Sequence, residues 1–270
     1  MEKGVGKLSE VKLVAVTKPL VKDENGNELT AEQFIAYIAR VSNPTNQLNN
    51  GTANKLLKYM VRNKHWSPFE QVDLTFEIKT TRDIGRQILR HRSFMFQEFS
   101  QRYAKVNTED FEYREARLQD TKNRQNSIET DNKELQDKWN TYQRNIIQSS
   151  RLAYEWALDN GIAKEQARVV LPEGMTPTHM YMKGSLRSWI TYLMVRTDSS
   201  TQKEHRNIAI SIKALVLEQF PSLVETVNSL TTSNLRKRLI NDLKEMLKSE
   251  ADTSWSKEDL TDLIVELESL

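Results

Sequence analysis

The segment VDLTFEIKT, residues 72–80, carries an apolar side chain at every second position. Val72, Leu74, Phe76 and Ile78 alternate with polar neighbours, which predicts a strand with one face in the core and the other turned away from it. The next segment, RDIGRQILRHR, changes to helical spacing. A half-buried strand that runs directly into a helix indicates a structure that mixes helices and sheet.

Capping patterns mark the starts of other helices. Thr30 with Gln33, and Thr201 with Glu204, each form a predicted capping box. The other predicted elements are, from the N-terminus, a strand at 11–16, helices at about 52–62 and 82–92, a long helix at 131–160, a strand at about 175–182, a helix from Ser185 to about Val195, and two charged helices in the last forty residues. Residues 107–127 are expected to form a loop. No internal repeat or separating linker is present, so we expect one α/β domain of the α+β type, rich in helix.

The long helix at 131–160 has a continuous apolar stripe and ends at Gly161, where a left-handed cap belongs. The stripe consists of Leu135, Trp139, Tyr142, Ile146, Ala153 and Trp156. This pattern fits packing against another subunit, and it fits the core of a single chain equally well.

Composition excludes several classes of protein. The 270 residues are 38% hydrophobic and 28% charged, and no apolar run is long enough to span a membrane. The N-terminal residues lack the apolar run of a secretion signal, so we expect a cytoplasmic protein. A net charge of +2 argues against a globally basic nucleic-acid coat, so any affinity for anions must come from local clusters.

The residue types that are missing restrict the chemistry. The chain has no cysteine, which excludes disulfides, thiolate metal sites and a cysteine nucleophile. Its four histidines show no HExxH spacing, so we expect no metal. The eight glycines form neither a dinucleotide-binding nor a P-loop pattern. If phosphates bind here, arginine side chains must hold them.

Arginines and aromatic residues are concentrated in residues 82–103, which end in LRHRSFMFQEFSQRY. Guanidinium groups bind phosphate oxygens in pairs and stack on flat rings. Gln87, Arg90 and His91 share one helix face. The same arginines, with Phe94, Phe96 and Phe99 as stacking partners, would also suit a nucleic-acid backbone or a neighbouring subunit.

Other polar residues have ordinary explanations as well as functional ones. Arg196 at a helix end can interact with the helix dipole, and Arg187 can extend from an apolar helix to solvent. His65 lies in a loop, and His179 and His205 are read as ordinary structural histidines. No serine has a visible base partner, so a Ser–His–Asp hydrolase is not supported.

Arg90-His91-Arg92, then seven residues, then Ser100 and the pair Arg102-Tyr103 resemble the signature of flavin-dependent thymidylate synthases. Four further segments resemble other parts of the family pattern: HWSPFEQVDLTFEIKTTRDIGRQILRHR, ARVVLP, GSLRSWITYLMVRTDSSTQKEHR and ARVSNP. Together they cover roughly residues 10–220. The division into a synthase domain at 1–220 and a C-terminal helical extension at 221–270 follows from this coverage.

The resemblance implies conversion of dUMP to dTMP with FAD, NADPH and methylene-tetrahydrofolate, and without a cysteine nucleophile. It also implies a mostly antiparallel sheet flanked by long helices, and a homotetramer with active sites between subunits. Nucleic acid and membranes are not expected as partners. A relative that acts on another pyrimidine nucleotide, such as dCMP, remains an alternative.

The resemblance also assigns roles by position. Arg196 would stand beside the pyrimidine as the catalytic residue. The residues implied in dUMP binding are Gln87, Arg90, Glu98, Phe99, Ser100, Gln101, Arg102 and Arg168. Those implied in FAD binding are His65, Ser67, Arg90, His91, Arg92, Glu98, Ser185, Leu186, Arg187 and Thr191. Thr191 and Gln71 depart from the family pattern, which commonly has Asn or His at the first position and His at the second.

Overall fold

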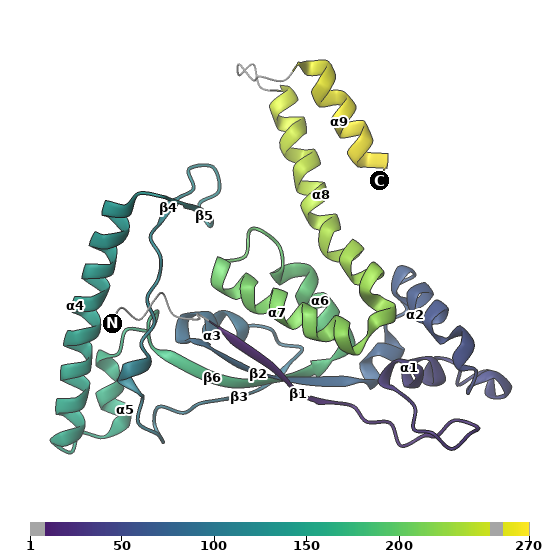
Figure 1. Cartoon of the computed structure of the whole chain (residues 1–270), viewed down its shortest axis with the longest axis horizontal. Coiled ribbons are helices and arrows are strands. Elements are labelled where there is room, and N and C mark those ends of the chain that lie inside the picture. The colour runs from purple at the N-terminus through teal and green to yellow at the C-terminus, as the bar shows by residue number, and fades with distance from the viewer. Residues whose placement is uncertain (1–8, 249–255, 270) are drawn as a thin grey trace.

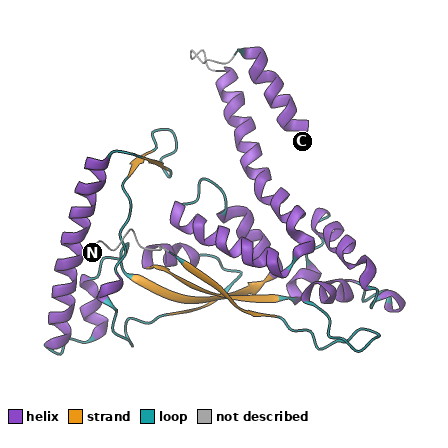
Figure 2. Ribbon diagram, viewed as in Figure 1, coloured by secondary structure: helices purple, strands orange, loops and turns teal. Residues whose placement is uncertain are grey.

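A four-stranded antiparallel sheet in the order β1-β2-β6-β3 lies at the centre of the molecule (Figures 1 and 2). The structure is a computed structural model and describes residues 9–248 and 256–269. Its strands are β1 (Glu10–Val16), β2 (Asp73–Thr81), β3 (Met95–Glu98) and β6 (Pro177–Ser185), with a separate pair, β4 (Arg117–Gln119) and β5 (Ser127–Glu129). The helices are α1 (Ala31–Ala39), α2 (Ala53–Arg62), α3 (Arg82–Ile88), α4 (Lys133–Asp159), α5 (Lys164–Ala167), α6 (Leu186–Arg196), α7 (Lys203–Gln219), α8 (Val224–Lys248) and α9 (Lys257–Ser269).

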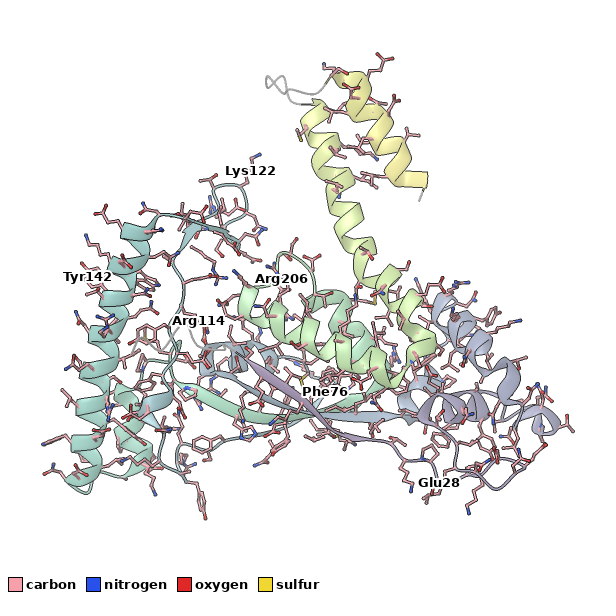
Figure 3. The ribbon with its side chains drawn as sticks, in the orientation of Figure 1. Glu28, Phe76, Arg114, Lys122, Tyr142 and Arg206 are labelled. Atoms are coloured by element: carbon pink, nitrogen blue, oxygen red, sulfur yellow. The ribbon has the colours of Figure 1, made fainter. Side chains whose placement is uncertain are left out.

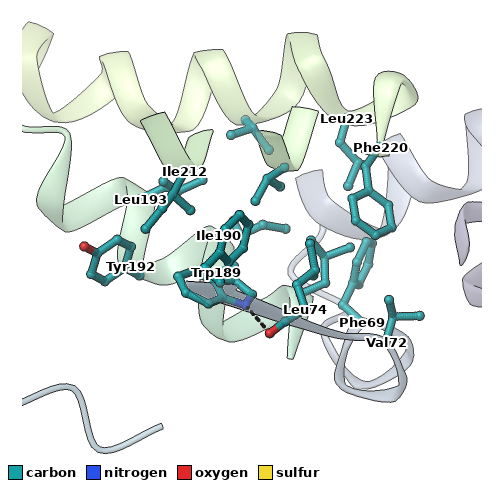
Figure 4. Packing of buried hydrophobic residues seen from close by; sticks show 14 of the residues in the cluster. Phe69, Val72, Leu74, Trp189, Ile190, Tyr192, Leu193, Ile212, Phe220 and Leu223 are labelled. Carbon is teal, nitrogen blue, oxygen red and sulfur yellow. Dashed lines mark hydrogen bonds between the residues drawn. The ribbon is translucent and has the colours of Figure 1, made fainter. Parts of the chain in front are cut away.

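The alternation in β2 sets the two faces of the sheet. Leu74, Phe76 and Ile78 are fully buried, as predicted. They pack with α6 and α7, which lie over that face in Figure 1. Trp189 of α6 closes the contact, because its indole Nε1 donates to the carbonyl oxygen of Leu74 at 3.2 Å (Figure 4). The sheet and these helices form one mixed domain with an antiparallel sheet, which confirms the predicted fold class.

The capping patterns had different outcomes. The Thr30 box is confirmed, because Gln33 exchanges both side-chain to backbone bonds with Thr30. The second box is wrong: α7 begins at Lys203, and no side chain caps its N-terminus. Glu204 is instead buried and forms ion pairs with two arginines of the segment leading into β4. Charge-assisted contacts in a buried site outweigh one hydrogen bond to a helix end.

The inner face of the long helix α4 is polar over its first turns and apolar near its C-terminus, where Tyr154 and Ala157 are buried. Gln143 is fully buried and exchanges two 2.8 Å hydrogen bonds with the backbone of Arg114, while Gln136 does the same for Ala116. Ser150 donates to the carbonyl of Val170. Arg114 therefore lies between α4 and the body of the molecule in Figure 3. The Gln136 and Gln143 side chains pair with the extended backbone of residues 114–116 much as a neighbouring strand would.

The predicted apolar stripe of α4 is on the outside. Tyr142 points away from the body in Figure 3, and the stripe residues are exposed except Ala153, which is half-buried. The exposed fractions reach 55% for Tyr142 and 62% for Trp156. The stripe therefore does not form the core of this chain.

Residues 107–127, expected as a loop, contain part of a small ordered pair of strands. Arg117 begins β4, and its guanidinium is 2.7 Å from Glu204. Lys203 at the start of α7 also reaches Glu129 of β5. These ion pairs attach the segment to α7, which the polar composition of the loop did not indicate.

The C-terminal region begins inside the main core. Phe220, Leu223 and Val227 are fully buried with the residues of α6 and α7. Farther along, α8 and α9 pack on each other through a separate cluster that includes Leu243, Leu260 and Ile264. The proposed boundary at residue 220 remains a prediction. The first eight residues, on which the expected lack of a secretion signal partly depends, lie outside the described part of the chain.

Among the described residues, no single helix is long and apolar enough to cross a membrane. The bent pair of α7 and the first part of α8 passes that test only when taken together. Its apolar residues Ile208, Ile212 and Val216 are fully buried in the core.

Candidate active site

The signature segment runs from the end of α3 along the edge strand β3. β3 pairs with β6 from Met95 opposite Lys183 to Glu98 opposite Met180. Phe94 packs edge-on against Trp189, with ring centroids 4.6 Å apart. A Cβ atom at Gly184 would lie 2.4 Å from the Phe94 ring, so only glycine fits there. This close packing fixes the start of β3 and the preceding histidine against α6.

His91 and Arg196 meet across the chain. Arg196 Nε donates to His91 Nε2 at 2.8 Å, although the residues are 105 positions apart. Burial and the nearby Arg196 charge lower the pKa of His91 to about 4, so the ring is neutral and can accept this bond. The bond orients the guanidinium and leaves its two terminal nitrogens for a ligand.

Gln87 lies at the same end of the site. Its amide contacts His205, which is fully buried, and the side chain of Gln202. Tyr192 bonds to the other nitrogen of His205 at 3.0 Å, and its ring packs against His91 at 4.9 Å. The structure therefore brings together Gln87, His91 and Arg196, three of the predicted residues, through two residues that the sequence reading left out.

Arg90 and Arg92 lie on either side of His91 and are exposed. Within the residues that the structure describes, neither side chain forms an ion pair or hydrogen bond. Positive charge without a local counter-charge attracts an anionic ligand or an acidic partner surface.

The second half of the signature leads toward α5. Glu98 accepts from Thr178 at 2.7 Å and lies 3.6 Å from Arg82, so it is held beside the start of α3. Gln101 is almost completely buried, and its Nε2 has no hydrogen-bond partner among the described residues. An unsatisfied buried donor is costly unless a ligand accepts from it.

Two of the arginines predicted to contact dUMP meet at α5. Arg102 Nε is 3.2 Å from a carboxylate oxygen of Glu165, and Arg168 Nε donates to the Glu165 carbonyl at 3.3 Å. Ser100 is exposed nearby in sequence, and Phe99 packs against the small cluster under α4. Glu165 was not identified from the sequence, because nothing in the residue pattern linked it to the signature.

The predicted flavin-binding residues of α6 gather at its first turns. Glu70 accepts from the hydroxyl of Ser185 and from Arg187, the latter at 2.8 Å. Leu186 is fully buried in the core, so only its backbone could reach a ligand. Ser67 is exposed in the short helical turn before β2, and His65 packs edge-on against Tyr59.

A groove of about 640 Å³ lies between α2, α6 and α8. It is lined by Val61, Arg62, Lys64, Trp66, Arg187, Thr191, Met194, Glu225, Thr226, Ser229 and Leu230. The buried hydroxyl of Thr226 has no hydrogen-bond partner among the described residues. A flat aromatic ring and several cations, beside the single carboxylate of Glu225, suit a polar ligand with ring systems.

The predicted residues thus fall into three groups in one chain. Gln87, His91 and Arg196 form the first, Arg102 and Arg168 the second, and the residues at the start of α6 the third. No contact found among the described residues joins the first group to the second. In the described part of the chain, no cluster of three or more His, Asp or Glu side chains could hold a metal.

An antiparallel sheet edge with ordered and uncommitted guanidinium groups defines a site for a small anionic ligand, of the kind found in nucleotide-binding enzymes. The family model described as Thy1, thymidylate synthase complementing protein, matches residues 27–222. The chain therefore belongs to the flavin-dependent thymidylate synthase family, which confirms the resemblance of the signature.

Similar proteins support this assignment. A probable flavin-dependent thymidylate synthase of Paramecium bursaria Chlorella virus 1 is 51% identical over 217 residues, which cover 80% of this chain and 98% of the relative. A flavin-dependent thymidylate synthase of Synechocystis sp. is 50% identical, over 79% of this chain and 97% of the relative. The crystal structure of the UMP/dUMP methylase PolB from Streptomyces cacaoi, bound with 5-Br dUMP, has a TM-score of 0.68 and 25% identity, over 82% of this chain and 95% of that chain.

Proposed function

We propose that this chain methylates dUMP to dTMP with bound FAD, NADPH as reductant and methylene-tetrahydrofolate as the one-carbon donor, in the cytoplasm. The observation that carries the proposal is the Arg196–His91 pair, a guanidinium fixed by a neutral acceptor at the end of the signature. A fixed cation stabilises negative charge that develops on a pyrimidine ring during reaction at its carbon. The chain has no cysteine, so an enzyme thiolate cannot activate the ring.

For the nucleotide, we propose that Arg102, Arg168 and Ser100 hold the phosphate, with Gln101 donating its unpaired Nε2. Glu165 already neutralises part of the charge of Arg102. A dianionic phosphate would replace this exposed and therefore weak ion pair. Gln87, Arg90, Glu98 and Phe99 would contact the rest of the nucleotide.

For FAD, the residues present fit the cofactor. The groove offers Trp66 as a flat surface, and its cations Arg62, Lys64 and Arg187 outnumber its one carboxylate, Glu225, as a diphosphate requires. Thr191 lies one turn after Arg187 on the same wall, so a contact there is retained despite its departure from the family pattern. Bound flavin would supply the reducing equivalents for the methyl group.

The remaining flavin contacts would come from the signature and the loop before β2. They are His65, Ser67, Arg90, His91, Arg92, Glu98, Ser185 and the backbone of Leu186. Among the described residues, no hydrogen bond or ion pair joins these flavin contacts to Arg102 and Arg168 of the nucleotide site. Sites shared between subunits would combine them.

We therefore propose a homotetramer with active sites between subunits. The exposed apolar stripe of α4 supports this, because Tyr142 and Trp156 are more than half exposed. Large exposed apolar side chains in a continuous stripe are typical of a subunit interface. The uncommitted guanidinium groups of Arg90 and Arg92 are then available to a ligand held partly by another copy.

The test is dTMP formation by the purified protein with dUMP, NADPH and methylene-tetrahydrofolate, with UMP and dCMP as alternative substrates. We expect a yellow protein, since oxidised FAD is yellow, and turnover with dUMP. Arg196→Ala should abolish dTMP formation while flavin remains bound. The matched control is Arg124→Ala, in the exposed β4–β5 connection. Near-normal turnover of Arg196→Ala, or turnover with dCMP instead of dUMP, would contradict the proposal.

A further inference from the structure

Glu204 anchors a series of hydrogen-bonded polar side chains that runs through Gln202 and Gln87 to His205, and that the proposed reaction does not explain. Its carboxylate is 4% exposed, with Arg117 Nη2 at 2.7 Å and Arg114 Nη1 at 3.2 Å. Burial alone would raise its pKa, but the two arginines outweigh burial and the pKa is lowered. Glu204 is therefore ionised and can only accept hydrogen bonds.

Because the Glu204 carboxylate can only accept, it fixes which partner donates in each hydrogen bond of the series. Gln202 must present its Nε2 to Glu204, at 2.9 Å, so its Oε1 faces Gln87. Gln87 must then present its own Nε2 to Gln202, at 2.7 Å, which leaves Gln87 Oε1 facing His205. An amide oxygen only accepts, so His205 donates from Nδ1, at 3.3 Å.

The same reasoning fixes the donors and acceptors at His205 and Tyr192, the other end of the hydrogen-bonded series. His205 is fully buried, and burial, together with the charge of Arg196 and the nearby His91, lowers its pKa to about 3. The ring is therefore neutral, and a neutral ring with a proton on Nδ1 accepts at Nε2. Tyr192 supplies the donor, with its hydroxyl 3.0 Å from that nitrogen. The series ends beside the Arg196–His91 pair, since the His205 and His91 ring centroids are 6.3 Å apart.

Among these hydrogen-bonded side chains, Gln87 is the one that the proposed function places against the nucleotide, and it is half-buried. A free glutamine side chain samples several rotamers and two amide orientations. Here one amide N–H is committed to Gln202 and one lone pair of the oxygen to His205. One N–H and one lone pair remain, at fixed positions, for a ligand.

We infer that His205 is a positioning residue for nucleotide binding: by donating from Nδ1 it fixes the amide of Gln87 in the orientation that dUMP meets. This inference rests on the proposed contact between Gln87 and dUMP. His205 shares its face of α7 with the fully buried Ile208 and Ile212, and an apolar residue in its place would leave both Gln87 and the Tyr192 hydroxyl without this partner. Its imidazole therefore contributes orientation that packing alone does not need.

The test compares two substitutions in the flavin-loaded protein. His205→Leu removes the donor to Gln87 and also the acceptor for Tyr192, and we expect it to raise the dissociation constant for dUMP about tenfold with unchanged flavin content. His205→Asn places an amide nitrogen where Nδ1 was, and we expect it to restore binding to within about threefold of the parent protein. Ile208→Val, one helical turn away and equally buried, controls for altered packing and should leave dUMP binding unchanged.

Wild-type binding by His205→Leu would overturn the inference, and so would equal weakening by Leu and Asn. A neutron structure without nucleotide tests the series separately, because it locates the hydrogen atoms. We expect the proton of His205 on Nδ1, and a proton on Nε2 instead would also overturn the inference. Failure of the parent protein to bind dUMP would refute the proposed function, while the neutron result would still decide the direction of the series.

Discussion

Glu112 provides a stability test that depends on pH. One of its carboxylate oxygens is buried without a hydrogen-bond partner among the described residues. Burial raises the pKa of Glu112 to about 7. The charge of Arg114 lowers this pKa in part, and the carboxylates of Asp110 and Asp83 raise it further. The unfolded chain titrates this group near its ordinary value of 4.5. Between these values the folded protein holds a proton that the unfolded chain has lost.

The sign and size of the effect follow from this difference. Stability falls as pH rises from about 4.5 to about 7, because ionisation is easier in the unfolded chain. At about 1.4 kcal/mol per pH unit, the upper bound is about 3 kcal/mol. Glu112 keeps part of its side chain exposed, and solvent reduces the effect to about 1–2 kcal/mol. Glu112→Gln, which cannot ionise, should therefore be more stable than the parent protein at pH 8 and similar to it near pH 5.

Thermal unfolding of both proteins at the two pH values measures this difference. We expect the melting temperature of Glu112→Gln to exceed that of the parent by a few degrees at pH 8 only. Glu24→Gln, an exposed glutamate in the turn before α1, is the control and should show no pH-dependent difference. An equal effect of Glu112→Gln at both pH values, or none at pH 8, would refute the raised pKa of the buried Glu112 carboxyl.

Four further substitutions test other parts of the structure. Ser100→Ala should weaken dUMP binding and keep some turnover, because no base partner marks the hydroxyl as a nucleophile; complete loss at saturating dUMP in a folded variant would contradict this. Gln143→Ala should cost roughly 2–4 kcal/mol in the free energy of unfolding, since it leaves the backbone N–H and carbonyl of Arg114 unpaired. Trp156→Glu should change the free energy of unfolding by less than about 0.5 kcal/mol. It should also shift the protein to smaller assemblies in size-exclusion chromatography. Gly184→Ala should destabilise by about 1–3 kcal/mol, measured by denaturant unfolding, because the new Cβ meets the Phe94 ring.

The sequence predicted those elements whose signal is local. The alternation in β2 and the capping box at Thr30 involve residues only a few positions apart, and both are confirmed. Thr201 and Glu204 show the same spacing and were wrongly assigned as a cap. The difference comes from Arg114 and Arg117, far away in sequence, whose buried ion pairs with Glu204 no local pattern can reveal.

The helix α4 shows a second limit. Its length and periodicity were predicted well, but periodicity does not say which neighbour each face meets. The apolar stripe, with Trp156 at its end, is exposed, and Gln143 is fully buried and Gln136 half-buried because their amides pair with an extended backbone segment. A buried glutamine face is an unusual solution, and only the fold reveals it.

For the candidate site, the signature identified the right region of the chain but not its contacts. The approach of Arg196 to His91 requires the fold of more than a hundred intervening residues. His205 was read as an ordinary structural histidine because a lone histidine in an apolar helix carries no local signal. Its role becomes visible only when Gln87 and Tyr192 are found on its two ring nitrogens.

In the proposed homotetramer, guanidinium groups from different subunits hold one nucleotide. The most direct measurement is the activity of a mixed assembly in which Arg102→Ala and Arg196→Ala chains are produced together in equal amounts. Each variant alone should be inactive. If Arg102 and Arg196 of different subunits serve the same site, random mixing restores an intact pair in about a quarter of the sites, and we expect about a quarter of the parent dTMP synthesis. No recovery in a mixed assembly, shown to contain both chains, would contradict the shared site.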